Sequence, residues 1–166
     1  HNPLLNYRPL PDELYCLITG ASNPQLKEAD LRGNSRFNPL DVSASFLNGE
    51  LFICAPLRGG LNFYTSQLFT TYRITPREVI FISNLSTAYQ LAVKGIGITY
   101  LAANYVDITR TKESPIFLMP GGKPAVRKVY AVYEDTHMTD LKQFFIDYAE
   151  RIMLEVQQRQ TGGASG

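Results

Sequence analysis

The polar side chains with the clearest grouping in this sequence stand at two turns that lead into predicted helices. The predicted ligand-binding residues are Arg58, Gly59 and Gly60 at the first turn, and Ser83, Asn84, Ser86 and Thr87 at the second. Glycine lets a ligand approach the backbone closely. The free N–H groups of a helix start attract a carboxylate or another anion. The two turns therefore predict a site for a small anionic molecule.

Each of these polar residues also has a simpler interpretation. Ser83, Asn84, Ser86 and Thr87 are all residue types that cap helices, so capping accounts somewhat better for any one of them taken singly. Arg58 could clamp a carboxylate or be an exposed cation of the loop. The sequence leaves both interpretations open.

The sequence offers little for catalysis or metal binding. Its two histidines, His1 and His137, have no partner at metal-ligand or catalytic spacing, and no Gly-x-Ser-x-Gly or Cys-x-x-Cys motif is present. The Gly95-Ile96-Gly97 run follows a predicted helix and opens a strand, which is the reverse of the order in a dinucleotide-binding turn. It fits a helix C-cap instead. We expect no catalytic residue, metal or cofactor, and we predict that the chain is not an enzyme.

The composition is that of an ordinary soluble domain. Of 166 residues 45% are hydrophobic, and 16 Lys and Arg against 15 Asp and Glu leave a net charge of +1, which argues against a DNA-binding surface on this chain. Cys16 and Cys54 stand in apolar runs, which is typical of buried thiols in a reducing compartment. No apolar stretch reaches the length of a membrane helix, and no signal peptide is recognisable. We expect a cytoplasmic location without membrane contact.

Hydrophobic patterns predict strands that alternate with helices. Strands are expected at 13–19, 50–55, 77–82, 97–101, 116–119 and 127–134, and helices at 39–48, 61–72, 85–94 and after Thr139. The last helix has one apolar face formed by Leu141, Phe144, Phe145, Tyr148, Ile152 and Val156. The pattern favours an α/β fold with a mainly parallel sheet, in which ligands bind beyond the carboxyl ends of the strands.

The segment 82–101, ISNLSTAYQLAVKGIGITYL, resembles the effector-binding domain of LysR-type transcriptional regulators. That family has Val-x-x-Gly-x-Gly-Ile here, with Ala92 in the Val place. Asn23-Pro24-Gln25-Leu26 stands where a His-Pro-Leu loop is usual, and Ala102 where a Pro follows. The similarity extends over about residues 3–156: it includes a crossing strand at 10–18, a return crossing at 126–134 and the terminal helix.

The resemblance implies an α/β, two-lobed, periplasmic-binding-protein-like (type 2) fold with Rossmann-like lobes, the first lobe partly missing. The domains implied are 1–16, the crossing strand and a remnant of lobe I; 17–125, lobe II; 126–158, the return crossing and terminal helix of lobe I; and 159–166, a flexible tail or linker. Because the chain begins without Met and ends in small residues, we expect a piece of a longer protein. The two turns fall on the family's ligand loops, and the resemblance adds Leu57 to the predicted ligand-binding residues of the first turn.

The implied function is sensing of a small effector in a cleft between the lobes, with transmission to DNA-binding domains. DNA would be contacted only through a winged helix-turn-helix domain absent from this chain, and the family implies a homo-oligomer, a dimer or tetramer. Two alternatives remain: a solute-binding protein of a transporter, and a small dehydratase-like enzyme of the same fold. If lobe I is incomplete, the apolar face of the last helix lacks partner surface, and either further chain or a second chain must cover it.

Overall fold

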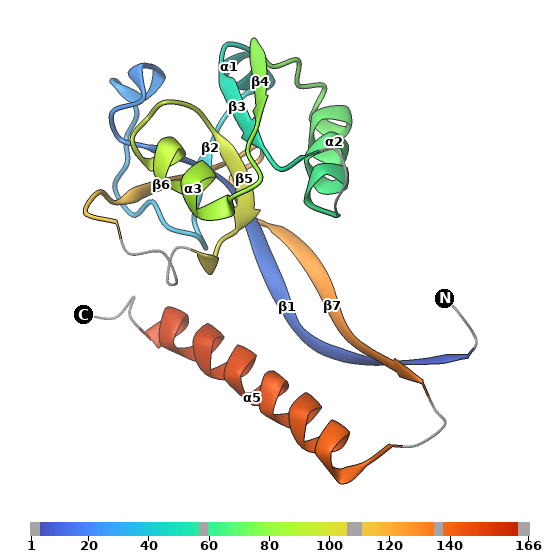
Figure 1. Ribbon diagram of the computed structural model, residues 1–166. Helices are drawn as coiled ribbons and strands as arrows, with labels where there is room; N and C mark the ends of the chain where they lie inside the picture. The colour runs from blue at the N-terminus through green and yellow to red at the C-terminus, as the bar shows by residue number, and fades with distance from the viewer. Residues whose placement is uncertain (1–3, 57–59, 106–110, 135–137, 163–166) are drawn as a thin grey trace. The chain divides into compact units, whose positions relative to one another are not determined.

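The computed structural model describes residues 4–56, 60–105, 111–134 and 138–162 (Figure 1). The chain divides into two compact units, which are described separately. Unit 1 comprises His1–Glu13 and Val126–Gly166, and unit 2 comprises Leu14–Ala125. No helix among the described residues is both long enough and apolar enough to cross a bilayer.

The described elements follow the predicted alternation of strands and helices. In chain order they are β1 (Leu5–Gly20), η1 (Pro24–Leu26), β2 (Leu40–Asp41), α1 (Ala44–Asn48), β3 (Leu51–Cys54), α2 (Gly60–Tyr72), β4 (Glu78–Phe81), α3 (Leu85–Val93), β5 (Thr99–Ala102), β6 (Pro115–Met119), β7 (Ala125–Glu134) and α5 (Asp140–Gly162).

The sheet of unit 2 is mixed, which corrects the prediction of a mainly parallel sheet. Its strand order is β2-β6-β1-β5, and β1 is antiparallel to both β5 and β6, whereas β2 is parallel to β6. β3 and β4 form a separate parallel pair. A parallel bridge between Phe52 of β3 and Ile98, the residue before β5, connects this pair to the larger sheet. The chain leaves β1 through a loop instead of a crossover helix, and a loop connection is compatible with antiparallel pairing.

Alternate residues of a strand point to opposite faces of the sheet, so a strand with apolar residues at every position has two apolar faces. Helices cover both of these faces. Leu17 and Phe52 pack with α2, where the rings of Phe52 and Phe69 are 4.8 Å apart. Ile18 packs on the other face with Tyr89 of α3. Both faces of these strands are therefore buried, which explains why their sequences are continuous apolar runs.

Both cysteines lie in this core as free thiols, as their apolar surroundings predict. Burial raises the pKa of the Cys16 thiol to about 12, although the charge of Arg36 acts in the opposite direction. Burial likewise raises the pKa of the Cys54 thiol to about 11. Both side chains therefore remain protonated at neutral pH and serve as small apolar groups.

The Gly-x-Gly segment that carries the family resemblance has a packing role. Gly95 follows the end of α3 with φ at +74°, the left-handed conformation of a helix C-cap. The end of β1 lies against this turn, since a Cβ on Gly20 would come within 1.8 Å of the Val93 carbonyl oxygen. The Ser22 hydroxyl donates a hydrogen bond to the Lys94 carbonyl at 2.8 Å. The segment thus joins α3 to β1.

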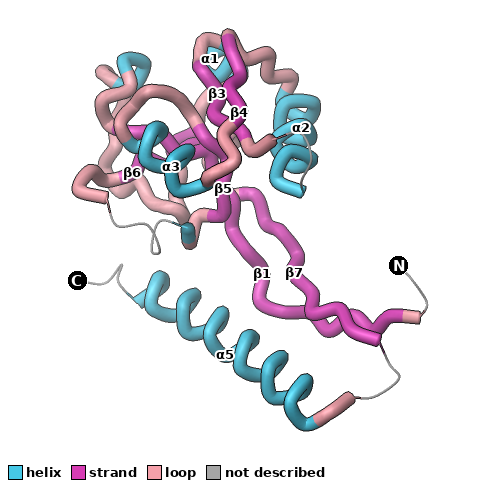
Figure 2. The backbone as a smooth tube through the Cα atoms, in the orientation of Figure 1, coloured by secondary structure: helices cyan, strands magenta, loops and turns pink. Residues whose placement is uncertain are grey.

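In unit 1 the strand β7 pairs with β1, and the two run side by side in Figures 1 and 2. α5 contacts the β1 part of this ribbon through Arg8, which forms salt bridges with Asp147 at 2.7 Å and Glu150 at 2.6 Å. The side-chain amide of Gln157 donates to the carbonyl of Asp12 at 2.6 Å.

Three element boundaries differ from the predictions by more than two residues. β1 begins at Leu5 instead of residue 13, because a two-stranded ribbon tolerates Pro9 and Pro11 at positions that need no donor. The helix predicted from residue 39 begins at Ala44, after the N-cap Ser43, and residues 40–41 form β2. α5 continues to Gly162, where a tail from residue 159 was predicted, since the Gln and Arg residues of its last turns favour helix.

Candidate functional site

The strands that precede the two predicted ligand turns end at the same edge of the sheet. β3 and β4 are parallel neighbours, and Cys54 lies opposite Phe81 at their carboxyl ends. The backbone N–H of Ile82 donates to the Cys54 carbonyl at 2.9 Å, so the chain enters the second turn beside the end of β3. α2 and α3 begin after these strands, which is the arrangement in which α/β folds bind ligands.

At the second turn the structure assigns a capping role to Asn84. Its side-chain Oδ1 accepts a hydrogen bond from the Thr87 backbone N–H at 3.1 Å, and its backbone is extended, as in an N-cap. Ser83 and Thr87 are exposed, and Ser86 is partly buried. The first-turn N–H groups of Leu85 and Ser86 lack intrahelical acceptors in this position of a helix, so they are the backbone donors available to an anion.

At the first turn Gly60 is the first residue of α2. The predicted ligand residues Leu57, Arg58 and Gly59 lie outside the described residues. Their roles in ligand binding therefore remain predictions from the sequence.

A cluster of aromatic rings adjoins the start of α2, and sequence reasoning did not identify it. The ring of Tyr15 lies 5.5 Å from that of Tyr100 and 6.3 Å from that of Tyr64, whose ring is 5.6 Å from that of Phe63. Tyr15 is buried, and its register partner Ala102 ends β5, which places the cluster near the carboxyl edge. Phe63 is 60% exposed. The contacts join three elements, so no spacing in the sequence reveals them.

A buried carboxyl group lies at the other end of β3. Glu50 directly precedes that strand, is 8% exposed, and accepts a hydrogen bond from the Asn23 side-chain amide at 3.2 Å. Burial raises the pKa of Glu50, whereas the hydrogen bond from Asn23 and the charge of Arg77 act to lower it. This acid ties the loop after β1 to β3, and it lies away from the candidate site.

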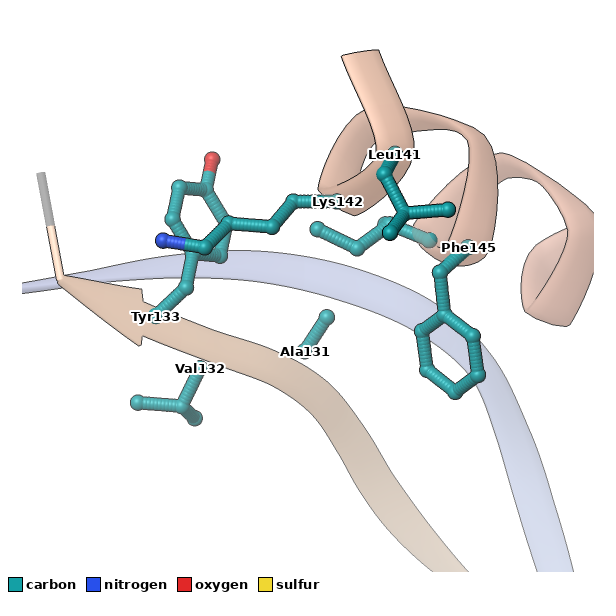
Figure 3. A pocket seen from close by; sticks show the side chains of 7 residues that line it. Ala131, Val132, Tyr133, Leu141, Lys142 and Phe145 are labelled. Carbon is teal, nitrogen blue, oxygen red and sulfur yellow. The ribbon is translucent and has the colours of Figure 1, made fainter. Parts of the chain in front are cut away.

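Among the hollows that described residues line are two that contain no predicted ligand residue. One, of about 270 Å³, lies on unit 2 beside β2 and contains Asp30 and Arg32, which form a salt bridge at 2.6 Å. The other, of about 580 Å³, lies in unit 1 between β7 and α5 (Figure 3). No cluster of three or more His, Cys, Asp or Glu that could hold a metal ion occurs among the residues that the structure describes.

No family model and no curated protein sequence matches the chain, but solved structures do. The CcmR regulatory domain from Synechocystis PCC6803, in complex with 2-PG, matches with a TM-score of 0.69 and 21% identity over 92% of this chain and 69% of its own. The BenM effector binding domain with its effector benzoate matches with a TM-score of 0.60 and 17% identity, over 84% of this chain and 59% of its own.

A third similar structure is the C-terminal domain of a probable LysR family transcriptional regulator from Rhodococcus sp. RHA1. Its TM-score is 0.64 and its identity 17%, over 89% of this chain and 68% of its own. The predicted fold is therefore confirmed: the chain has the type 2 periplasmic-binding-protein-like fold of these domains. It spans between 59% and 69% of the length of the three structures.

Proposed function

Because the chain has the fold of the effector-binding domains of LysR-type regulators, we propose that it is the effector-sensing domain of a bacterial transcriptional regulator. It binds a small anionic molecule at the carboxyl edge of unit 2. The observation that supports the proposal is the hydrogen bond from the Ile82 N–H to the Cys54 carbonyl, which joins the end of β3 to the residue that follows β4. Two helices begin at the turns after these strands, and both present N–H groups and positive dipole ends there.

Each predicted residue has a role in this proposal. The N–H groups of Leu85 and Ser86 donate to the anion, and the hydroxyls of Ser83 and Thr87 contact the rest of the ligand. Asn84 acts through its cap on Thr87, which holds the first turn of α3 in place. Leu57, Arg58, Gly59 and Gly60 enter the proposal from the sequence, with Arg58 as the counter-charge. The exposed ring of Phe63, in the first turn of α2, offers an apolar contact.

Sensing follows from a difference in affinity. An effector that binds one conformation of the domain more tightly shifts the population toward that conformation. In the proposed regulator this shift changes how copies of the chain pair, as a dimer or tetramer, and so moves winged helix-turn-helix domains on DNA in the cytoplasm. The chain performs no catalytic step in this scheme. The two alternatives, a transporter's solute-binding protein and a dehydratase-like enzyme, gain no support from the solved neighbours, which are regulator domains.

A titration of two matched variants tests the site. Benzoate, succinate and inorganic phosphate serve as probes in calorimetry with the unmodified chain, with Thr87→Trp and with Thr71→Trp. Thr71 is an exposed threonine in the last turn of α2, away from the candidate site. We expect Thr87→Trp to weaken binding of the best probe at least about tenfold, because the larger side chain occupies the space that the probe needs. Thr71→Trp should leave the affinity unchanged. Unchanged affinity in Thr87→Trp would refute the site.

A further inference from the structure

The aromatic cluster of unit 2 lies on the face of the sheet that α2 covers. Tyr100 packs against the core of that face, which contains Leu17 and Phe52. Tyr15 is two residues before Leu17 in β1 and therefore points to the same face. Its ring lies 5.5 Å from that of Tyr100 and 6.3 Å from that of Tyr64. The cluster thus connects β1, β5 and α2 on one side of the sheet.

The strand register places these rings at the carboxyl edge. Tyr15 is paired with Ala102, the last residue of β5, and Tyr100 is two residues before Ala102 on the same face. β5 is next to β3 through the bridge between Phe52 and Ile98, and β3 is paired with β4. Two strand spacings therefore separate β5 from β4, whose end leads into α3, and this distance is on the order of 10 Å. That is the scale of a small organic molecule.

The outermost ring of the cluster is that of Phe63. Exposure rises from 5% at Tyr15 to 60% at Phe63, and the half-buried Tyr64 contacts both rings. The rings of Phe63 and Tyr64 meet edge to face, with centroids 5.6 Å apart and an interplanar angle of 80°. A single exposed Phe is ordinary on a protein surface, but this ring continues a packed row. It therefore offers an apolar surface that other rings support.

The row of rings ends in the first turn of α2. This helix begins at Gly60, and Phe63 follows about 4.5 Å further along the helix axis. Helical side chains lean toward the N-terminus of their helix, which brings the rings of Phe63 and Tyr64 closer to that end. The N–H groups of a first turn attract a carboxylate. One ligand can therefore place a carboxylate at a helix start and a ring against Phe63.

We propose that the effector is an aromatic carboxylate, with its ring against Phe63 and its carboxylate at the N–H groups of the helix starts. The inference rests on the function proposed above and names the ligand class of the same site. An aromatic ring gains more from this surface than an aliphatic group of equal area, because paired rings have favourable edge-to-face and offset arrangements. Phe63 is then a specificity-determining residue that separates aromatic acids from other acids.

Titration with benzoate, cyclohexanecarboxylate and acetate tests the ligand class, because the three probes have the same charge and differ in the group attached to the carboxylate. The amide signals of Leu85 and Ser86 in nuclear magnetic resonance spectra report binding into the millimolar range. We expect benzoate to bind at least about tenfold more tightly than acetate, since its ring is buried against Phe63. Benzoate should also bind at least about twofold more tightly than cyclohexanecarboxylate.

Three variants of α2 locate the ring contact. Phe63→Ser should weaken benzoate binding at least about fivefold and leave acetate binding unchanged. Phe63→Tyr keeps the ring and should bind benzoate within about twofold of the unmodified chain. Tyr72→Ser is the control, because Tyr72 is a 37% exposed ring of the same helix, about 14 Å from Phe63 along the axis. It should change the affinity for neither acid.

The outcomes distinguish the ligand class from the site. Three results would overturn the aromatic preference while a weakening by Thr87→Trp still supports the site: equal affinities for benzoate and acetate, tighter binding of cyclohexanecarboxylate than of benzoate, or equal losses in Phe63→Ser and Tyr72→Ser. If Thr87→Trp binds all three acids as the unmodified chain does, or if none of them binds, the proposed function fails and this inference fails with it.

Discussion

Removing the Asn84 cap separates the structural role of this turn from its proposed binding role. In the structure the exposed Asn84 side chain accepts one hydrogen bond, from the Thr87 N–H at 3.1 Å. Asn84→Ala therefore loses the cap and little else. The cost expected for such a loss is about 1 kcal/mol, which lowers the melting temperature of a chain of this size by about 2–4 °C. Asn84→Ser keeps a capping oxygen and should melt within about 1 °C of the unmodified chain.

The same substitution should weaken effector binding by a comparable free energy. The ligand must then order the first turn of α3 before it can use the N–H groups of Leu85 and Ser86. A cost of about 1 kcal/mol corresponds to roughly a fivefold loss of affinity. Ser83→Ala, at an exposed position outside the helix, should leave the melting temperature unchanged and reduce affinity alone.

Circular dichroism melts and calorimetric titrations of the three variants provide both readings. Equal melting temperatures for Asn84→Ala and the unmodified chain would refute the capping role. A stability loss in Asn84→Ala with no change in the affinity of any probe would refute the role of the α3 N-terminus in binding.

Two further predictions concern unit 2. Gly20→Ala places a Cβ against the Val93 carbonyl oxygen, a backbone atom that cannot move away, and should lower the free energy of unfolding in urea by about 3 kcal/mol. Gly49→Ala is the control, because its Cβ meets the movable end of the Gln25 side chain. An equal loss in both variants would contradict the packing of β1 on α3. Because burial raises the pKa of Glu50, this group favours the folded state below the ordinary glutamate pKa, and the contribution is lost as pH rises through the raised value. Glu50→Gln has no group to ionise at this position and should not show that loss. The free energies of unfolding of Glu50→Gln and the unmodified chain, measured in urea over a pH series, should therefore change differently with pH, and most so above the raised pKa. The same pH dependence in both proteins would refute this role of Glu50.

The elements that local signals define could be predicted from the sequence. α3 is an example, since an amide residue stands at its N-cap and Gly95 takes the left-handed conformation after its end. The parallel register of β3 and β4 brings the ends of the two strands that precede the predicted ligand turns to one edge, as the alternation of strands and helices indicates. The family resemblance supplied the fold class, and the solved structures confirm it.

Features that depend on contacts between distant segments could not be predicted. The antiparallel direction of β1 depends on its pairing with β5 and β6, more than 80 residues later. The contacts of Tyr15 with Tyr64 and Tyr100 join three elements. Helical periodicity identified the apolar face of α5, but periodicity does not say whether the chain itself covers that face, and in the described part of unit 1 it is exposed.

A titration of backbone amides by nuclear magnetic resonance tests the central claim most directly. The unmodified chain is titrated with benzoate, succinate and inorganic phosphate, and the shifts of the amide signals are followed residue by residue. The account predicts saturable shifts that are largest at Leu85, Ser86 and the first turn of α2, with α5 unaffected. Saturable shifts confined to other surfaces, or none from any of the three anions, would contradict it.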